Sequence, residues 1–377
     1  MLVAAGAEAQ APDRSTRIDR IDRASRAADI DRSAKRAIER RQAQAAASDQ
    51  QQPAEPSDPL VADDRLARAR DGFAARRGEI LALDMSDAAR TAALGAGMTV
   101  ISDARLGSAG PQLTRLNAPA PLDPGAMLDL LRAADPGGLF DFNHAFAASG
   151  PTPQQQQPEL PAMQAGGRYR IGMIDGGVLV SHADLRAAAI TQRAFPAASG
   201  PVATDHGTAV AGKLAETFDA PFALLAADVL TETGAKWTGA DALAEALAWM
   251  TAERVGIVNI SLAGPPNVIV GRMVALHLTS GGEIIAAAGN NGPFSQLIYP
   301  AAYPGVIGVT AVDAAGGVWP MASTGSHVDR SAPGVDVTVA TLSGHAVVSG
   351  TSYAAPVVAA RMAIEEAAPA ATLATVR

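Results

Sequence analysis

The chain has 377 residues, of which 48% are hydrophobic, and carries a formal net charge of −8. This length is enough for two domains with sizeable cores, and the acidic balance lacks the basic field that nucleic-acid binding needs. Cysteine is absent, which excludes disulfides and thiolate metal sites. No apolar run approaches the length of a membrane span, so we expect a water-facing protein without a nucleic-acid partner.

Residues 1–60 lack the pattern of a folded core. The first eleven residues, "MLVAAGAEAQA", have an apolar stretch and an Ala-x-Ala site but no basic start, so an incomplete signal peptide and a disordered end are both open. Residues 13–52 are dense in Arg and Asp, which indicates a solvated helix or disorder, with a basic interaction tail as the alternative. A signal peptide predicts a secreted or periplasmic bacterial protein.

A small α+β domain is expected over residues 61–147. Strand-like stretches occur at "GEILALDM", "MTVISDARL", "PQLTRLNAP" and "GGLFDFNHAF", and helical stretches at "SDAARTAALGAG", with Ser86 as its cap, and "PGAMLDLLRAAD". The resulting β-α-β-β-α-β order is that of ferredoxin-like domains. The Pro- and Gln-rich residues 148–167 then predict a linker with a processing site.

Residues 168–377 alternate apolar strands with amphipathic helices. The strands are expected at "RYRIGMID", "FALLAADVL", "GIVNISLAG", "EIIAAAGNN" and "PGVIGVTAVD", with helices between them. This alternation predicts an α/β domain with a doubly wound, mostly parallel sheet covered by helices on both faces. Ligands in such sheets bind at the carboxyl ends of the strands.

Three side chains in this domain suit acyl transfer. Asp175 ends the strand "RIGMID", His206 opens the helix "HGTAVAG", and Ser352 opens the helix "SYAAPVVAARMAIEEAA", in whose first turn we expect Pro356. A serine attacks, an imidazole takes its proton, and a carboxylate orients the imidazole. The chain order Asp, His, Ser excludes an α/β-hydrolase, which needs Ser, acid, His. Each of these residues could instead merely cap or open a helix. The glycines of "DGG" could belong to a Rossmann loop, but no G-x-G-x-x-G follows the first strand.

Five motifs occur together in one order: "IDGG", "DHGTAVAG", "NISLAG", "AAAGNNGP" and "SGTSYAAP". Together they resemble the subtilase family of serine proteases over about residues 168–366. The resemblance implies a subtilisin-like serine endopeptidase with Asp175 as orienting acid, His206 as base and Ser352 as nucleophile. It also makes Asn290 the oxyanion-hole residue, which agrees with its place at the end of "EIIAAAG".

The resemblance further implies how peptide or protein substrates bind. The family's strand-pairing segment and pocket wall correspond to Ser261, Leu262, Ala263 and Gly264, and the opposite wall to residues 286–289, including Ala288 and Gly289. Both walls are small and apolar, so we expect an uncharged or apolar residue before the scissile bond. Residues 61–147 resemble a subtilase pro-domain, which implies a self-processing zymogen inhibited by its own N-terminal unit. Calcium is common in the family, but no acidic cluster here has ligand spacing, so no cofactor or metal is expected.

Four positions depart from the family pattern: Gly176, Asp205, Ala209 and Ala263. Gly176 stands where the family usually has a hydroxyl residue beside Asp175. Gly176→Ser is therefore expected to raise turnover modestly, by lowering the activation free energy by about 1 kcal/mol, the contribution of one hydrogen bond. These departures keep one alternative open, a catalytically silent homologue that serves as a binding or interaction module.

The histidines other than His206 carry no chemical motif. His182 precedes a helix for which Asp184 is a candidate cap, and we assign it a structural role. His144 lies in an expected strand of the small α+β domain, and we expect His277, His327 and His345 to be packing or solvated residues.

Overall fold

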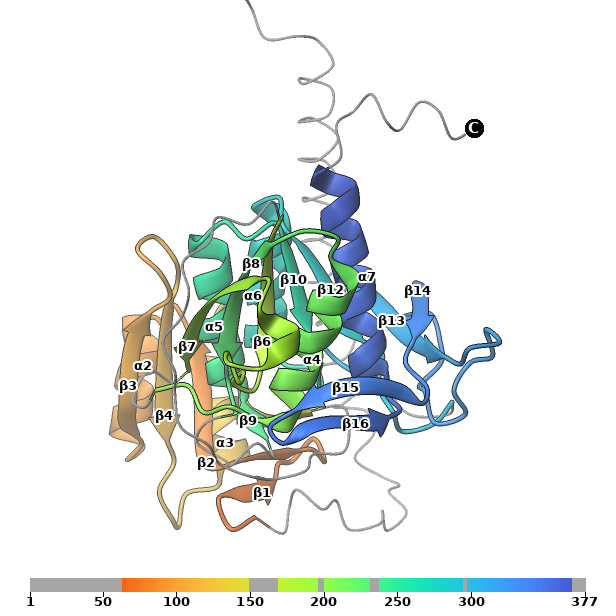
Figure 1. The fold of residues 1–377 in the computed structure, drawn as a ribbon. Coiled ribbons are helices and arrows are strands. Elements are labelled where there is room, and N and C mark those ends of the chain that lie inside the picture. The colour runs from red at the N-terminus through yellow and green to blue at the C-terminus, as the bar shows by residue number, and fades with distance from the viewer. Residues whose placement is uncertain (1–62, 149–168, 196–199, 231–236, 294–296, 368–377) are drawn as a thin grey trace, which may run out of the picture.

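The N-terminal unit of the computed structural model is an antiparallel sheet with two helices (Figure 1). The structure describes residues 63–148, 169–195, 200–230, 237–293 and 297–367. The sheet order is β5-β2-β4-β3, and β1 pairs with β2. The elements of this unit are β1 (Leu66–Arg68), β2 (Ala74–Leu83), α2 (Asp87–Gly95), β3 (Thr99–Arg105), β4 (Gln112–Asn117), α3 (Pro124–Ala134) and β5 (Leu139–Ala148).

A seven-stranded parallel sheet forms the second unit, in the order β14-β13-β12-β10-β6-β8-β7. Its strands are β6 (Tyr169–Asp175), β7 (Ala188–Ala194), β8 (Phe222–Asp228), β10 (Ile257–Ile260), β12 (Glu283–Ala287), β13 (Ile307–Val312) and β14 (Arg330–Pro333). Its helices are α4 (Asp205–Thr217), α5 (Ala240–Ala252), α6 (Val268–Thr279) and α7 (Thr351–Ala367). The doubly wound α/β architecture predicted from the sequence is therefore present.

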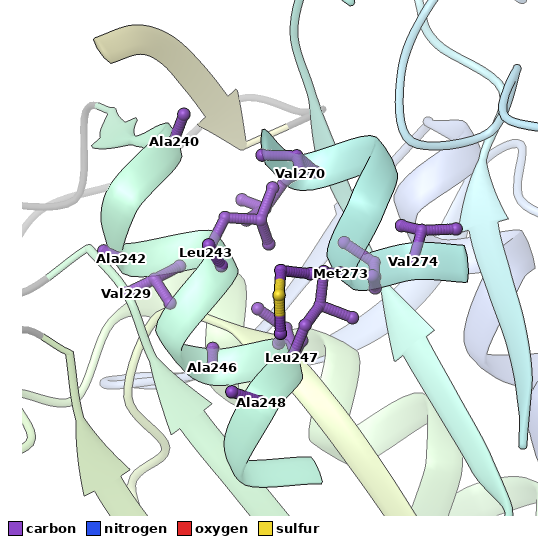
Figure 2. Close-up of a cluster of buried hydrophobic side chains, with 14 of the residues drawn as sticks. Val229, Ala240, Ala242, Leu243, Ala246, Leu247, Ala248, Val270, Met273 and Val274 are labelled. Carbon is purple, nitrogen blue, oxygen red and sulfur yellow. The ribbon is translucent and has the colours of Figure 1, made fainter. Parts of the chain in front are cut away.

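The two faces of this sheet bury separate cores, as the residues of β12 show. Ile284 and Ala286 pack with α5 and α6, whereas Ile285 and Ala287 pack with α4 and α7. Because successive side chains of a strand point to opposite faces, a strand covered on both faces needs an unbroken apolar run. Figure 2 shows Leu243 and Leu247 of α5 directed toward Met273 of α6 in the first of these cores.

Shorter elements surround the carboxyl edge of the sheet. They are β9 (Thr238–Gly239), β11 (Leu262–Ala263), the hairpin strands β15 (Val337–Thr341) and β16 (Gly344–Val348), and the 3₁₀ helix η2 (Ala183–Leu185). The cap of η2 is His182, not Asp184 as expected: the His182 ring accepts a hydrogen bond from Asp184 N at 3.2 Å.

The two units meet at the start of α6. Val268 N donates to Asp141 Oδ2 at 2.8 Å, and the cap residue Asn267 donates to Phe142 O at 2.9 Å. An ion pair of 3.0 Å between Arg115 and the buried Asp241 joins the N-terminal sheet to α5. Burial raises the pKa of Asp141, and the α6 N–H group compensates part of that cost.

The predicted segments 1–60 and 149–167 lie outside the described residues, while Ala148, assigned to the linker, ends β5. The predicted strands and helices are present in both units. Strands β1, β7, β9 and β14 and the β15–β16 hairpin were not predicted. No helix within the described ranges is long and apolar enough to cross a membrane.

Candidate active site

Asp175 and His206 form a buried hydrogen-bonded pair. Asp175 is the last residue of β6, and His206 lies in the first turn of α4. His206 Nδ1 lies 2.8 Å from Asp175 Oδ1, which also accepts from Gly176 N at 2.7 Å. A carboxylate at Nδ1 fixes the ring so that the proton sits on that nitrogen and Nε2 carries the lone pair.

Glycines allow the strand end and the helix to approach this closely. A Cβ on Gly207 would overlap with Gly176 O and would lie 2.6 Å from Gly176 C. Thr204 caps α4 by accepting from Gly207 N at 2.9 Å. Because Gly207 has no side chain, the start of α4 can contact the backbone of Gly176, and this contact places the imidazole beside the carboxylate.

Thr204 also fills the space beside Gly176. A Cβ on Gly176 would overlap with Thr204 Oγ1, and Thr204 is both β-branched and held by its cap. This geometry argues against the expectation that Gly176→Ser raises turnover, because a serine there must shift Thr204, which caps the His206 helix. Among the described residues, Asp175 Oδ2 has no hydrogen-bond partner.

Ser352 lies in the first turn of α7, supported by Ser261. Pro356 lies in the second turn of the helix, not in the first as expected, so Ser352 O receives no N–H from the residue four positions on. Ser261 Oγ donates to Ser352 O at 3.0 Å, and Asn259 Nδ2 donates to Ser261 Oγ at 3.0 Å. Ser261, predicted to line the substrate pocket, thus fixes the helix that carries Ser352.

Tyr353 brings the start of α7 against the start of α4. Its ring lies 5.8 Å from the His206 ring, measured between centroids, and burial raises the pKa of its hydroxyl. Ser352 Oγ donates to Ser261 O at a long 3.4 Å, and His206 Nε2 has no hydrogen-bond partner in the described part of the chain. Such contacts commonly tighten only when substrate binds.

The side chain of Asn290 is held by the residue before Ser352. Its Oδ1 accepts from Thr351 N at 3.0 Å and from Thr351 Oγ1 at 2.8 Å. Thr351 Oγ1 in turn accepts from Gly289 N at 3.2 Å, where Gly289 has a φ of +106°. Since Oδ1 is engaged, Nδ2 is the end of Asn290 that can donate to an oxygen near Ser352.

Strand β5 runs between two short strands of the second unit. Ala147 and Ala148 pair antiparallel with Ala263 and Leu262 of β11. On its other side, Ala145 and Phe146 pair with Gly239 and Thr238 of β9.

Gly264 lies directly beneath the Phe146 ring. A Cβ on Gly264 would overlap with that ring, and Phe146 is fully buried. Leu262 is buried in the core, and Ala288 is buried with its N–H bonded to Val309 O. The predicted wall residues Leu262, Ala263 and Gly264 therefore contact β5.

Two clusters of described residues could hold a cation, and neither contains Asp175 or His206. In the first, His144 Nε2 lies 2.9 Å from Asp71 Oδ2, and Asn267 Nδ2 contacts His144 Nδ1 at 3.0 Å. Both ring nitrogens of His144 are thus engaged by protein groups. The second cluster is His182, Asp184 and His345.

A doubly wound sheet with an Asp–His pair at its carboxyl edge and a serine at a nearby helix start is the arrangement of subtilisin-like proteins. The family model described as the subtilase family matches residues 166–377. A subtilisin of Bacillus pumilus is 33% identical over 233 residues, covering 55% of this chain and 82% of that protein. The chain belongs to the subtilase family, whose members are serine proteases.

Two further comparisons agree. Subtilisin E of Bacillus subtilis (strain 168) is 32% identical over 276 residues, 66% of this chain and 69% of that protein. The solved structure of fervidolysin from Fervidobacterium pennivorans, described as a keratinolytic enzyme related to subtilisin, aligns with a TM-score of 0.60. That alignment covers 77% of this chain and 54% of the other at 20% identity, so it supports the fold alone.

Proposed function

We propose that this protein is a serine endopeptidase that forms an acyl-enzyme on Ser352 and is made as a self-processing zymogen. The observation that carries the proposal is the 2.8 Å contact between His206 Nδ1 and Asp175 Oδ1, in a buried site beside the helix that begins with Thr351 and Ser352. Nothing among the described residues favours the silent homologue.

In the proposed reaction, Ser352 Oγ turns from Ser261 O to His206 Nε2 and attacks the peptide carbonyl carbon. His206 takes the hydroxyl proton at Nε2, and the Asp175 carboxylate stabilises the resulting imidazolium. The oxyanion accepts hydrogen bonds from Asn290 Nδ2 and the Ser352 N–H. His206 then gives its proton to the leaving amine, and water repeats the sequence to release the acyl group.

The N-terminal unit is proposed to be a ferredoxin-like pro-domain that inhibits the enzyme. Its last strand adds to β11 and β9 by main-chain pairing, the way an extended peptide binds to a sheet edge. The match to subtilisin E covers 66% of this chain, more than residues 166–377 supply, so it includes part of this unit. Ser352 would then cut the chain after Ala148, in the linker that lies outside the described residues.

The β5 contacts also suggest the substrate class. Phe146 occupies a buried site beside Gly264, so the enzyme should accept extended peptides with a large apolar side chain at that position. The small residues Ala263, Ala288 and Gly289 favour an uncharged or apolar residue before the scissile bond. We also propose that the enzyme acts outside the cytoplasm, because its first eleven residues contain an apolar stretch and an Ala-x-Ala site.

Processing of the full-length chain tests both parts of this proposal. Wild type should shorten to a new N-terminus within residues 149–168 and hydrolyse peptides, whereas Ser352→Ala should remain full length and inactive. Ser331→Ala, an exposed serine on β14, is the matched control and should behave as wild type. Processing of Ser352→Ala at the same site in a host that lacks other proteases would contradict self-processing. Peptide hydrolysis by the purified Ser352→Ala protein would contradict the assignment of the nucleophile.

A further inference from the structure

His182, Asp184 and His345 converge from two segments that are about 160 residues apart in the chain. His182 and Asp184 flank the start of η2, and His345 lies on β16. His345 Nε2 lies 2.9 Å from Asp184 Oδ2, and His182 Nδ1 lies 3.8 Å from Asp184 Oδ1. One donor atom of each of the three residues lies within 4.8 Å of the other two.

The ring of His182 is already held in one tautomer. Its Nε2 lies 3.1 Å from Gly344 O, and only a protonated Nε2 can donate to a carbonyl. Its Nδ1 accepts from Asp184 N, so that nitrogen carries the lone pair. Metal-binding histidines also place one ring N–H on a backbone carbonyl, and an ion bound here would take the Nδ1 lone pair in place of the Asp184 N–H.

We propose that His182, Asp184 and His345 form a binding site for a divalent ion of the zinc class. Two imidazoles and one carboxylate, with further positions open to water, are a ligand set that Zn²⁺ accepts. The side chains of Asp184 and His345 are 38% and 50% exposed, so they can turn the short distance needed to close on an ion. Ca²⁺ prefers oxygen ligands, so two imidazoles disfavour it.

The proposed ion site joins the segment that follows Asp175 to the segment that precedes Ser352. His182 follows Asp175 by seven residues, and His345 precedes Ser352 by seven. The same hairpin is bonded to the start of α4, because Leu342 N donates to Asp205 Oδ1 at 2.8 Å. An ion bound here cross-links η2 to the hairpin and stabilises the folded state by mass action.

Zinc titration of the tag-free, full-length Ser352→Ala chain tests the site without autolysis. After treatment with EDTA and buffer exchange, calorimetry with ZnCl₂ at pH 7.5 should show one site, and saturating Zn²⁺ should raise Tm by on the order of 5 °C. Adding His345→Ala or Asp184→Asn should weaken this binding at least tenfold and remove the Tm rise. Both side chains are partly exposed, and circular dichroism establishes that the variants fold.

Glu365→Gln is the matched control, since Glu365 is an exposed carboxylate on α7 away from the cluster, and it should leave zinc binding unchanged. Any Tm rise with CaCl₂ should be equal with and without His345→Ala, because two imidazoles disfavour Ca²⁺ at this site. The site is refuted by a chain that does not bind Zn²⁺, or by binding that is equal with and without His345→Ala. A Tm rise with Ca²⁺ that His345→Ala removes refutes the assigned class of ion.

Discussion

Thr204 Oγ1 occupies the space that a side chain on Gly176 would need, and a Cβ built on Gly176 also falls 2.9 Å from Thr204 Cγ2. Thr204 caps the helix that carries His206, while Gly176 N donates to the Asp175 carboxylate. The glycine and the threonine therefore set the position of the Asp175–His206 pair together.

Gly176→Ser should lower activity, because overpacking this contact costs about 1–3 kcal/mol, which corresponds to roughly a 5- to 150-fold loss in kcat/KM if the strain falls on the pair. Adding Thr204→Gly to Gly176→Ser should recover part of the loss, since it removes the clashing side chain. Thr204→Gly alone is the control for the lost cap. If Gly176→Ser were faster than wild type, a serine would fit beside Thr204 without displacing the Asp175–His206 pair, and the predicted steric conflict would be contradicted.

Ser261→Ala should reduce kcat by about tenfold with the fold intact, because it leaves Ser352 O without its hydroxyl donor, a loss of about 1 kcal/mol or more. Ser331→Ala serves again as the control. Pro356→Ala should partly rescue Ser261→Ala, since the peptide N–H that it introduces can donate to Ser352 O. Equal activity of wild type and Ser261→Ala would mean that this hydrogen bond does not position Ser352.

Phe146→Ala in the N-terminal fragment 61–148 should weaken inhibition of the mature enzyme by at least about 30-fold, because buried aromatic anchors contribute about 2 kcal/mol or more. The inhibition constant of the fragment is the measurement. Leu94→Ala, an exposed residue of α2, is the control and should inhibit as wild type does. An unchanged inhibition constant for the Phe146→Ala fragment would mean that Phe146 does not contribute to binding of the fragment to the enzyme.

Stability should fall with acidification partly through His277. Burial lowers the pKa of His277 to about 4, and Gly282 packs against its Nε2. The unfolded chain binds the proton near pH 6.5, so the contribution of His277 to stability is complete above that pH and is lost as pH falls toward 4. Between pH 6.5 and 5 the loss should reach about 2 kcal/mol.

Urea unfolding of the full-length Ser352→Ala chain, with and without His277→Gln, measures this loss. Because glutamine does not titrate, the difference in the free energy of unfolding between the two proteins should change by about 2 kcal/mol between pH 6.5 and 5. Parallel pH profiles for the two proteins would rule out His277 as a source of the acid sensitivity.

The elements that carried long buried apolar runs could be predicted from the sequence, because covering both faces of a parallel sheet demands such runs. Strand β7 contains Thr191, Gln192 and Arg193 and lies at the edge of the sheet, so its pattern carried no such signal. The β15–β16 hairpin is similarly short and mixed in polarity.

The positions of Asp175, His206, Asn290 and Ser352 at strand ends and helix starts could also be predicted, because each follows or opens a recognisable element. Contacts between distant segments could not. The overlap of Gly176 with Thr204, the donation from Ser261 to Ser352 and the approach of His345 to Asp184 depend on tertiary packing. Pro356 inside α7 was a usable signal, since it leaves one carbonyl in need of a donor.

Covalent labelling by a fluorophosphonate tests the central claim most directly, because this reagent reacts with a serine only when a base activates it. Purified wild-type protein, shortened to its mature form, should be labelled once, with the modified peptide mapped to Ser352. His206→Ala should prevent labelling, although Ser352 is still present. A folded, processed wild-type protein that stays unlabelled, or that is labelled at another serine, would contradict the account.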